Sequence, residues 1–337
     1  MKKILSAAVA IFAAAFILAG CNEKNKKTEN DSEQAALNQT DEQALETDRT
    51  FKIGIIQLVE HPALDKSYQG FVDGLAEAGF KIGENIVIDY QNAQGEQANC
   101  FTIANKFVND KDDLIFAIAT PAAQAVANLT KDIPILVTAV TDPESANLVK
   151  SNSLPGTNVS GTSDLTPVAA QIALLKKIVP NAKTVGLMYC SSEANSIFQI
   201  NLAKEACEAN GLSYIEGSVS NSNEIQQVTQ SLVGKVDAFY VPTDNMLAAG
   251  MANVAMVANE AKLPVICGED GMVVSGGLAT YGINYYELGK LTAVQAVKIF
   301  KEGANPAEMP IEYVDKFDFS FNQATKDAIG IEFPEGL

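Results

Sequence analysis

Apolar runs alternate with segments of helical spacing along most of the chain. Residues 113–140 comprise an apolar run, a Thr-Pro pair, a segment of small apolar residues, an Ile-Pro pair and a second apolar run. This pattern predicts strand, helix, strand, with Thr120 as the helix cap and Pro121 in the first turn. The pattern returns over residues 237–270, where Asp244 takes the place of Thr120. The chain therefore contains an internal duplication.

The duplication extends upstream and predicts two similar α/β lobes. Residues 52–56 (KIGII) correspond to residues 184–188 (TVGLM), and each run precedes a helical segment that ends at a glycine, Gly79 or Gly211. Each copy holds several helices and strands, so it can bury a core of its own, unlike a solenoid repeat. Strands that alternate with helices predict a parallel sheet with helices on both faces. We expect two doubly wound, Rossmann-like lobes.

The hydrophobic pattern also predicts where the chain passes between the lobes. We expect strands over 51–58, 85–90, 113–119, 134–140 and 182–189, and helices over 63–79, 97–109, 167–179 and 285–302. The three crossings are expected near 159–162, after 278–284 and within 311–321. The predicted domains are a signal peptide at 1–20, a lipidated cysteine and tether at 21–50, an N-terminal lobe of 51–162 plus about 285–312, and a C-terminal lobe of 163–284 plus about 313–337.

The N-terminus has the pattern of an export signal. Lys2 and Lys3 precede an apolar run over 4–18, which is shorter than the roughly 20 residues of a membrane-spanning helix. The run ends on Leu-Ala-Gly before Cys21, which matches the lipobox of bacterial lipoproteins, in which the cysteine is lipidated. An uncleaved anchor with an incidental cysteine is the alternative. We expect an extracytoplasmic protein that is lipid-anchored to the bacterial cell membrane.

The polar composition of residues 22–50 predicts a disordered tether, because it offers little to bury. A weak helix over 33–46 is the alternative for this segment.

The amino-acid composition argues against several classes of binding partner. The formal net charge of -17 argues against a nucleic-acid partner, which requires a basic surface. One histidine and no CxxC pair give little capacity for zinc, so we predict neither a metal nor a cofactor. Four cysteines lie in apolar surroundings and are expected to be small buried side chains without a disulfide: Cys100, Cys190, Cys207 and Cys267.

Candidate binding residues follow the strands of both lobes. In parallel α/β sheets a ligand binds outside the carboxyl ends of the strands. In the first lobe these positions are Glu60, His61, Thr120, Pro121, Ala122, Thr141 and Asp142. In the second lobe they are Ser191, Ser192, Glu193, Asn195, Ser196, Thr243, Asp244, Asn245 and Glu269.

These residue types suit a zwitterion. Helix N-termini after Thr120 and around residues 192–196 present N–H groups that favour an anion. Three carboxylates, Glu193, Asp244 and Glu269, favour a cation and require a counter-charge. An α-amino acid satisfies both sets. The single arginine, Arg49, lies in the predicted tether, so backbone N–H and hydroxyl groups must hold the ligand carboxylate. Capping without ligand contact is the alternative for Thr120, Ser192 and Asp244.

The sequence does not predict an enzyme. GxSxG, GxxxxGK[ST] and GxGxxG are absent, and no nucleophile–histidine pair is apparent. We therefore predict no catalytic residue. His61 is expected to be a loop position or a ligand contact and not a general base.

Several runs carry a family resemblance: HPALD (61–65), DYQNAQG (89–95), ATPAAQA (119–125), TAVTDP (138–143), EANS (193–196), SLVGKVDAFYVPTDN (231–245) and ATYGINYYELG (279–289). On these runs the chain from residue 51 to about 329 resembles the bacterial ABC-transporter substrate-binding proteins of the tryptophan/tyrosine type. Two positions depart from the family pattern, since Glu269 and Asn284 stand where relatives often carry Asp.

The resemblance implies a type I periplasmic-binding-protein-like fold, with three crossovers and a ligand cleft between the lobes. It also implies an aromatic or bulky apolar amino acid as ligand, and an ABC permease with its cytoplasmic ATPase as partner. We expect a monomer. A ligand sensor that partners a membrane receptor is the alternative function.

Overall fold

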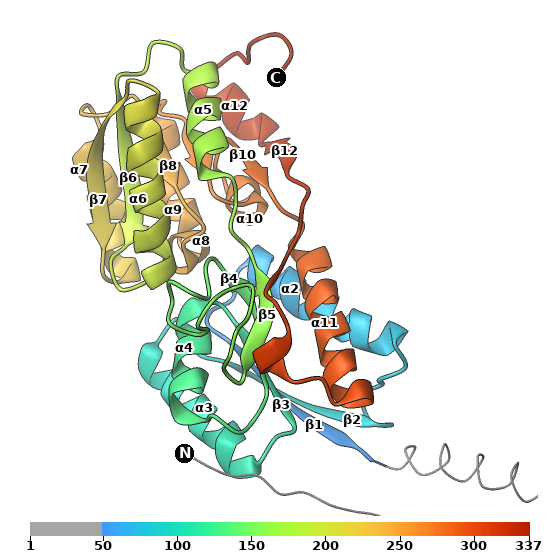
Figure 1. Ribbon diagram of the computed structural model, residues 1–337. Helices are drawn as coiled ribbons and strands as arrows, with labels where there is room; N and C mark the ends of the chain where they lie inside the picture. Colours follow the sequence, from blue (N-terminus) through green and yellow to red (C-terminus); the bar gives the residue numbers. More distant parts are fainter. Residues whose placement is uncertain (1–48) are drawn as a thin grey trace, which may run out of the picture. The chain divides into compact units, whose positions relative to one another are not determined.

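The computed structural model describes residues 49–337, which form two six-stranded sheets (Figure 1). The strand orders are β11-β5-β4-β3-β1-β2 and β12-β10-β9-β8-β6-β7. Strand for strand the two orders are equivalent, as the internal duplication predicts, and the α/β class with two doubly wound lobes is confirmed. The predicted signal peptide, the lipidation site at Cys21 and nearly all of the predicted tether lie outside the described residues.

The first lobe is built on a parallel sheet. Its strands β3 and β4 are buried throughout, because helices cover both faces of the sheet. The strands are β1 (Phe51–Gln57), β2 (Ile86–Asn92), β3 (Leu114–Ile118), β4 (Ile135–Val140), β5 (Val159–Ser163) and β11 (Glu312–Tyr313). The helices are α2 (Pro62–Glu77), α3 (Gln97–Asp110), α4 (Thr120–Leu129) and α11 (Tyr285–Glu302), with a 3-10 turn η2 (Pro306–Glu308).

The second lobe repeats this plan. Its strands are β6 (Thr184–Cys190), β7 (Ser213–Val219), β8 (Ala238–Val241), β9 (Val265–Cys267), β10 (Ala279–Gly282) and β12 (Asp318–Phe321). Its helices are α5 (Val168–Ile178), α6 (Ala194–Ala209), α7 (Ile225–Leu232), α8 (Asn245–Ala249), α9 (Met251–Glu260), α10 (Asp270–Val274) and α12 (Gln323–Ile329), with a 3-10 turn η1 (Ser222–Glu224).

Matching hydrogen bonds support the duplication. Asp113 accepts a bond from the Lys52 N–H at 2.8 Å, and Asp237 accepts one from the Thr184 N–H at 2.9 Å. Both carboxylates tie the strand they precede to the first strand of their own sheet. Asp113 and Asp237, which correspond to each other in the duplication, therefore make equivalent hydrogen bonds in the two lobes.

One strand departs from the predicted parallel arrangement. β12 pairs with β10 in the antiparallel sense. The chain reaches β12 directly from β11, whose partner β5 runs towards the other lobe. Because β12 enters the second sheet from the side of the first lobe, it must run away from the first lobe, whereas β10 runs towards the first lobe. The third crossing therefore dictates the direction of β12.

The chain crosses between the lobes from β5 to α5, from β10 to α11 and from β11 to β12, which confirms the three predicted crossings (Figure 1). After the second crossing, α11 returns to the first lobe and packs against α2. A Cβ atom on Gly70 would clash with the Tyr286 carbonyl, and one on Gly289 would clash with the Ser67 carbonyl. The two helix backbones approach more closely there than any side chain permits.

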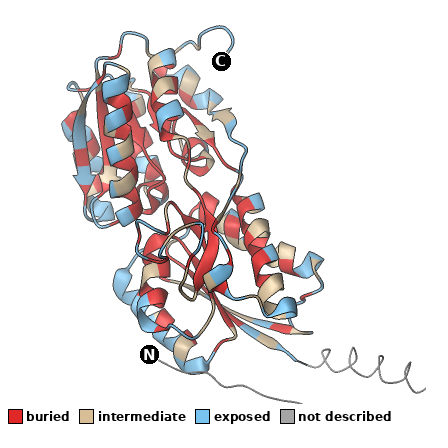
Figure 2. Ribbon diagram, in the orientation of Figure 1, coloured by how far each residue is buried: buried red, intermediate tan, exposed pale blue. Residues whose placement is uncertain are grey.

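Each sheet is buried between exposed helix faces (Figure 2). The prediction for the cysteines is confirmed: Cys100, Cys190, Cys207 and Cys267 are buried thiols. Within residues 49–337, no helix combines the length and the apolar character that crossing a membrane requires.

Candidate functional site

The residues that follow the strands of the two sheets contact one another across the lobes. Thr141 follows β4 and lies with its Oγ1 3.4 Å from Oγ1 of Thr243, which follows β8. Gln199 of α6 donates to Oγ1 of Thr141 at 3.1 Å. Nε2 of His61, before α2, is 3.5 Å from Oδ1 of Asn245, at the start of α8. The strand ends of both lobes therefore border a common site.

A small cavity of about 10 Å³ lies at this junction. That volume is room for about one water molecule, so the side chains of the two lobes nearly fill the junction in this structure. Its apolar lining is Leu64, Ala139, Ala248 and Met272. Its polar lining is His61, Asp164, Thr243, Asp244, Asn245, Glu269 and Tyr285.

Five predicted binding residues line this cavity: His61, Thr243, Asp244, Asn245 and Glu269. Three line a larger polar groove beside it: Pro121, Ser192 and Glu193. Five are buried but line neither hollow: Thr120, Ala122, Thr141, Asn195 and Ser196. The remaining three are Glu60 and Ser191, which are exposed, and Asp142, which accepts a bond from the Ser145 N–H at 2.6 Å and so closes its own loop.

The predicted helix caps are correct at one position of three. Asp244 caps α8 and accepts a bond from the Leu247 N–H at 2.8 Å. Thr120 does not cap α4, because the helix begins at Thr120 itself and Ala119 occupies the cap position. Ser192 does not cap α6, since Glu193 takes that position and the Ser192 Oγ lies 3.0 Å from the Cys190 sulfur.

The start of α4 is strained and leaves a polar group without a partner. Ala119 has φ 84° and ψ 151°, a region that residues with a Cβ rarely adopt, at a cost of about 1–3 kcal/mol. The Thr120 hydroxyl is buried and has no hydrogen-bond partner among residues 49–337. Backbone strain beside an unsatisfied buried hydroxyl is typical of a site that a ligand completes.

The three predicted carboxylates find their counter-charge in helix N-termini. Glu193 accepts bonds from both nitrogens of Asn245 and from the Met246 N–H at 3.0 Å. Asp244 accepts from the Cys190 and Leu247 N–H groups at 2.5 and 2.8 Å. Glu269 accepts from the N–H groups of Gly271 and Met272. A side-chain cation is therefore not their main partner, contrary to the simplest expectation.

Burial nevertheless disfavours charge on these groups. Desolvation raises the pKa of Glu269 to about 7 and that of Asp164 to about 6. Desolvation, reinforced by the nearby charge of Glu193, also raises the pKa of Asp244. A cationic group that entered the cavity would restore a favourable environment for the ionised forms. His61 shows the converse effect, since burial lowers its pKa to about 4 and keeps the imidazole neutral at pH 7.

Three residues of the site escaped the sequence analysis: Asp164, Gln199 and Tyr285. Asp164 follows β5, and one of its oxygens accepts a bond from the Tyr285 hydroxyl at 2.7 Å. Asp164 could have been predicted, because it also follows a strand at its carboxyl end. Gln199 lies inside α6 and donates to Oγ1 of Thr243 at 2.6 Å. Nothing in the local sequence distinguishes Gln199 from an ordinary helical residue.

The Asp164–Tyr285 bond joins two crossings, so we expect its removal to be measurable. Tyr285→Phe leaves the buried Asp164 carboxylate without this donor and should lower the free energy of unfolding by about 1–3 kcal/mol at pH 7.5. The bond favours the charged carboxylate, so the loss should shrink below the pKa of about 6. Urea unfolding at pH 7.5 and pH 5 measures the loss of stability and its dependence on pH. Tyr281→Phe, at a half-buried tyrosine whose ring packs on Phe319, is the control; equal losses in the two variants would contradict the assignment.

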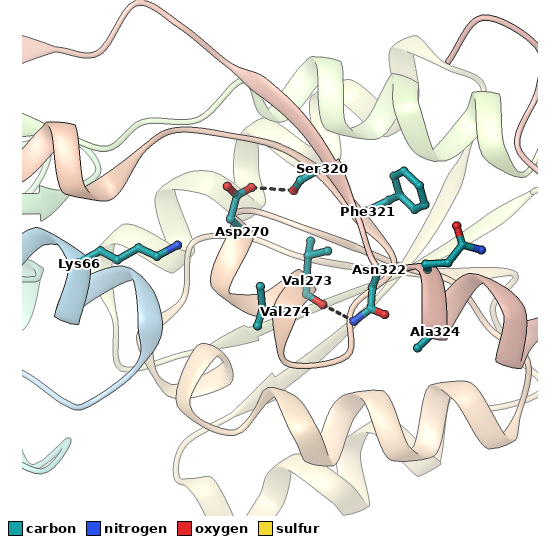
Figure 3. Close-up of a pocket in the computed structure, with 9 residues that line it drawn as sticks. Lys66, Asp270, Val273, Val274, Ser320, Phe321, Asn322 and Ala324 are labelled. Carbon is teal, nitrogen blue, oxygen red and sulfur yellow. Dashed lines mark hydrogen bonds between the residues drawn. The ribbon is translucent and has the colours of Figure 1, made fainter.

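A second pocket lies where Lys66 of α2 faces α10 and the segment around β12 (Figure 3). Two of its polar side chains already have partners: the Ser320 hydroxyl donates to Asp270 at 2.7 Å, and the Asn322 side chain donates to the Val273 carbonyl at 2.8 Å. None of its described polar lining atoms is buried without a partner. The inter-lobe cavity is therefore the stronger candidate site.

The chain is similar to known proteins over most of its length. The family model described as "ABC transporter substrate binding protein" matches residues 52–337. A protein named "Tyrosine-binding protein", from Clostridioides difficile strain R20291, is 43% identical over 98% of this chain and 93% of its own.

Two solved structures are similar as well. The ABC domain from Streptococcus pneumoniae in complex with L-Trp has 40% identity and a TM-score of 0.82, over 85% of this chain and 96% of its own. The ligand-free, open structure of a substrate-binding protein with adhesive properties from Clostridium difficile has 51% identity but a TM-score of 0.66, over 85% of this chain and 97% of its own. The lower score at the higher identity indicates that the lobes here are arranged more nearly as in the L-Trp complex.

Proposed function

Because this chain belongs to the family of ABC-transporter substrate-binding proteins, we propose that it is the ligand-binding subunit of an importer, with an aromatic amino acid as its ligand. The ligand is held between the lobes and delivered to the permease, which a cytoplasmic ATPase drives. The names of two relatives, one tyrosine-binding and one in complex with L-Trp, support this choice of ligand. The role is binding without catalysis.

The observation that carries this proposal is the set of buried acceptors at the inter-lobe junction. One oxygen of Asp164, one nitrogen of His61 and the amide oxygen of Asn195 are buried without a partner among the described residues. Leaving a buried acceptor unsatisfied costs about 1–3 kcal/mol each. A ligand rich in donors relieves that cost, and an ammonium group is the donor that suits the carboxylates Asp164 and Glu269.

We propose that the ligand carboxylate lies at the start of α4, where Pro121 lines the larger polar groove. The Thr120 hydroxyl is without a partner there, and the first N–H groups of a helix favour an anion. The only guanidinium of the chain is engaged elsewhere, since Arg49 pairs with Asp113 at 2.5 Å, before the start of β3. This pairing supports the view that peptide N–H and hydroxyl groups hold the carboxylate. The predicted binding residues of both lobes remain the proposed contact set.

The proposed location is the outer face of the membrane. The export signal and the lipobox at Cys21 support secretion and lipid anchoring of a monomer, with residues 21–50 as the tether. The proposed lobes are 51–162 with about 285–312, and 163–284 with about 313–337; these divisions place each crossing at a lobe boundary.

A panel of the common L-amino acids tests the proposal. Tyrosine or tryptophan should raise the melting temperature of the purified mature protein and bind at micromolar or tighter affinity, since a ligand at 100 times its Kd adds about 2.7 kcal/mol of stability. Differential scanning fluorimetry followed by titration calorimetry measures both. No shift and no heat with any member of the panel would refute the proposal.

A further inference from the structure

The hydrogen bonds around His61 define its tautomer. The amide nitrogen of Asn245 donates to Glu193 at 2.5 Å, and a carboxylate can only accept. The amide oxygen of Asn245 is therefore the atom that faces Nε2 of His61, at 3.5 Å. An oxygen in that position can only accept, so the contact favours the tautomer that carries the proton on Nε2. The imidazole is neutral, because burial lowers its pKa to about 4, and Nδ1 is left as a bare acceptor.

This arrangement depends on both lobes. His61 belongs to the first lobe, whereas Asn245 and Glu193 belong to the second. Asn245 and Glu193 are thus positioning residues, which fix the tautomer of His61 only when the lobes are together. The tautomer that leaves Nδ1 as an acceptor therefore depends on the contact between the lobes.

Nδ1 has no partner of its own. It is buried and without a hydrogen bond among residues 49–337, and His61 lines the inter-lobe cavity. The cavity also holds the carboxylates of Asp164 and Glu269. An ammonium group gains most from a charged acceptor, which leaves the neutral nitrogen of His61 for a neutral donor.

We infer that Nδ1 of His61 accepts a hydrogen bond from the ring O–H or N–H of an aromatic amino acid, and that this bond selects tyrosine and tryptophan over phenylalanine. The inference rests on the proposed function and deepens it. Phenylalanine fills similar space but has no ring donor, so it leaves Nδ1 buried and unsatisfied. A site built to bind a polar group rejects the analogue that lacks it far more strongly than an apolar pocket rejects a small change in size.

Titration calorimetry with matched ligands tests this selection. The native protein should bind tyrosine at least about tenfold more tightly than phenylalanine. His61→Leu should weaken tyrosine binding at least about tenfold and change phenylalanine binding by less than about threefold, which removes the preference. Gln69→Leu, on the exposed side of the same helix, is the control and should preserve it.

The tautomer has a direct spectroscopic test. His61 is the only histidine of the chain, so protein labelled with 15N-histidine and purified without a histidine tag gives the signals of one imidazole. With tyrosine bound, Nε2 should be protonated and Nδ1 bare, and the Nδ1 resonance should move upfield relative to the phenylalanine complex. Asn245→Leu should mix the two tautomers. A protonated Nδ1 in the tyrosine complex would overturn the inference.

The outcomes separate the two proposals. If no amino acid binds, the proposed function fails and the inference fails with it. If amino acids bind but tyrosine and phenylalanine bind equally, or His61→Leu weakens both alike, the ring-donor bond is refuted while the proposed function stands. Loss of the preference in His61→Leu together with a bare Nδ1 supports both.

Discussion

Replacing Glu193 with leucine is expected to abolish measurable ligand binding and to lower the free energy of unfolding by about 3 kcal/mol. The Glu193 side chain is buried, and it joins the start of α6 to the start of α8 through the Asn245 amide and the Met246 N–H. Leucine fills similar space but accepts nothing, so these buried donors lose their partner. Asn245 and His61 then lose their fixed orientation.

Urea unfolding and calorimetry measure the two effects of Glu193→Leu. Glu205→Leu, at an exposed position of the same helix, is the matched control and should change the free energy of unfolding by no more than about 0.5 kcal/mol. Glu193→Gln keeps an acceptor oxygen and should retain part of the stability. A leucine variant that unfolds like the native protein would show that these bonds do not hold the two helix starts.

Lowering the pH below 7 is expected to weaken amino-acid binding by up to about tenfold per pH unit for each carboxyl that must ionise. Burial raises the pKa of Glu269 to about 7 and that of Asp164 to about 6. A ligand ammonium favours the charged carboxylates, so binding at pH 6.5 should release protons. Calorimetry in buffers of different ionisation enthalpy counts them. Ligand binding to Glu269→Gln should release fewer protons.

The stability of the ligand-free protein should show the opposite trend. The folded-state pKa of Glu269 lies above its ordinary value, so the protonated form contributes stability at low pH. That contribution is complete below about pH 4.5 and is lost as the pH rises through 7, and saturating ligand should reduce the loss. If the melting temperature rose from pH 5 to pH 8 in the native protein but not in Glu269→Gln, the raised pKa would be contradicted.

The duplication and the order of elements could be predicted because both depend on local signals. Apolar runs of strand length, proline in the first helical turn and glycine after the last turn recur in both lobes. The direction of β12 could not be predicted, since it depends on the side from which the chain enters the second sheet. Strand direction at that edge is a consequence of the crossing and not of residues 318–321.

The candidate site was predicted in part, for a similar reason. Residues after strands, such as His61, Asp244 and Glu269, are identified by their place at the end of an apolar run. The predicted caps at Thr120 and Ser192 were wrong because a shift of one residue in the start of a helix changes which residue is the cap. At α4 the helix begins one residue earlier than predicted, with Ala119 in a strained backbone conformation at the cap position. Gln199 was missed because it reaches the site from inside a helix, where only the folded arrangement reveals it.

The contact between α2 and α11 has a consequence for biosynthesis. The two helices meet at Gly70 and Gly289, more than two hundred residues apart in the chain, and complete the same lobe. A chain that emerges from its amino end must therefore produce all of the second lobe's main body before the first lobe can close its core. The second lobe also waits for the end of the chain, because β12 and α12 follow α11 in the sequence. Each lobe therefore completes its core only when the last fifty residues or so have emerged, and the two lobes should mature together and late in synthesis.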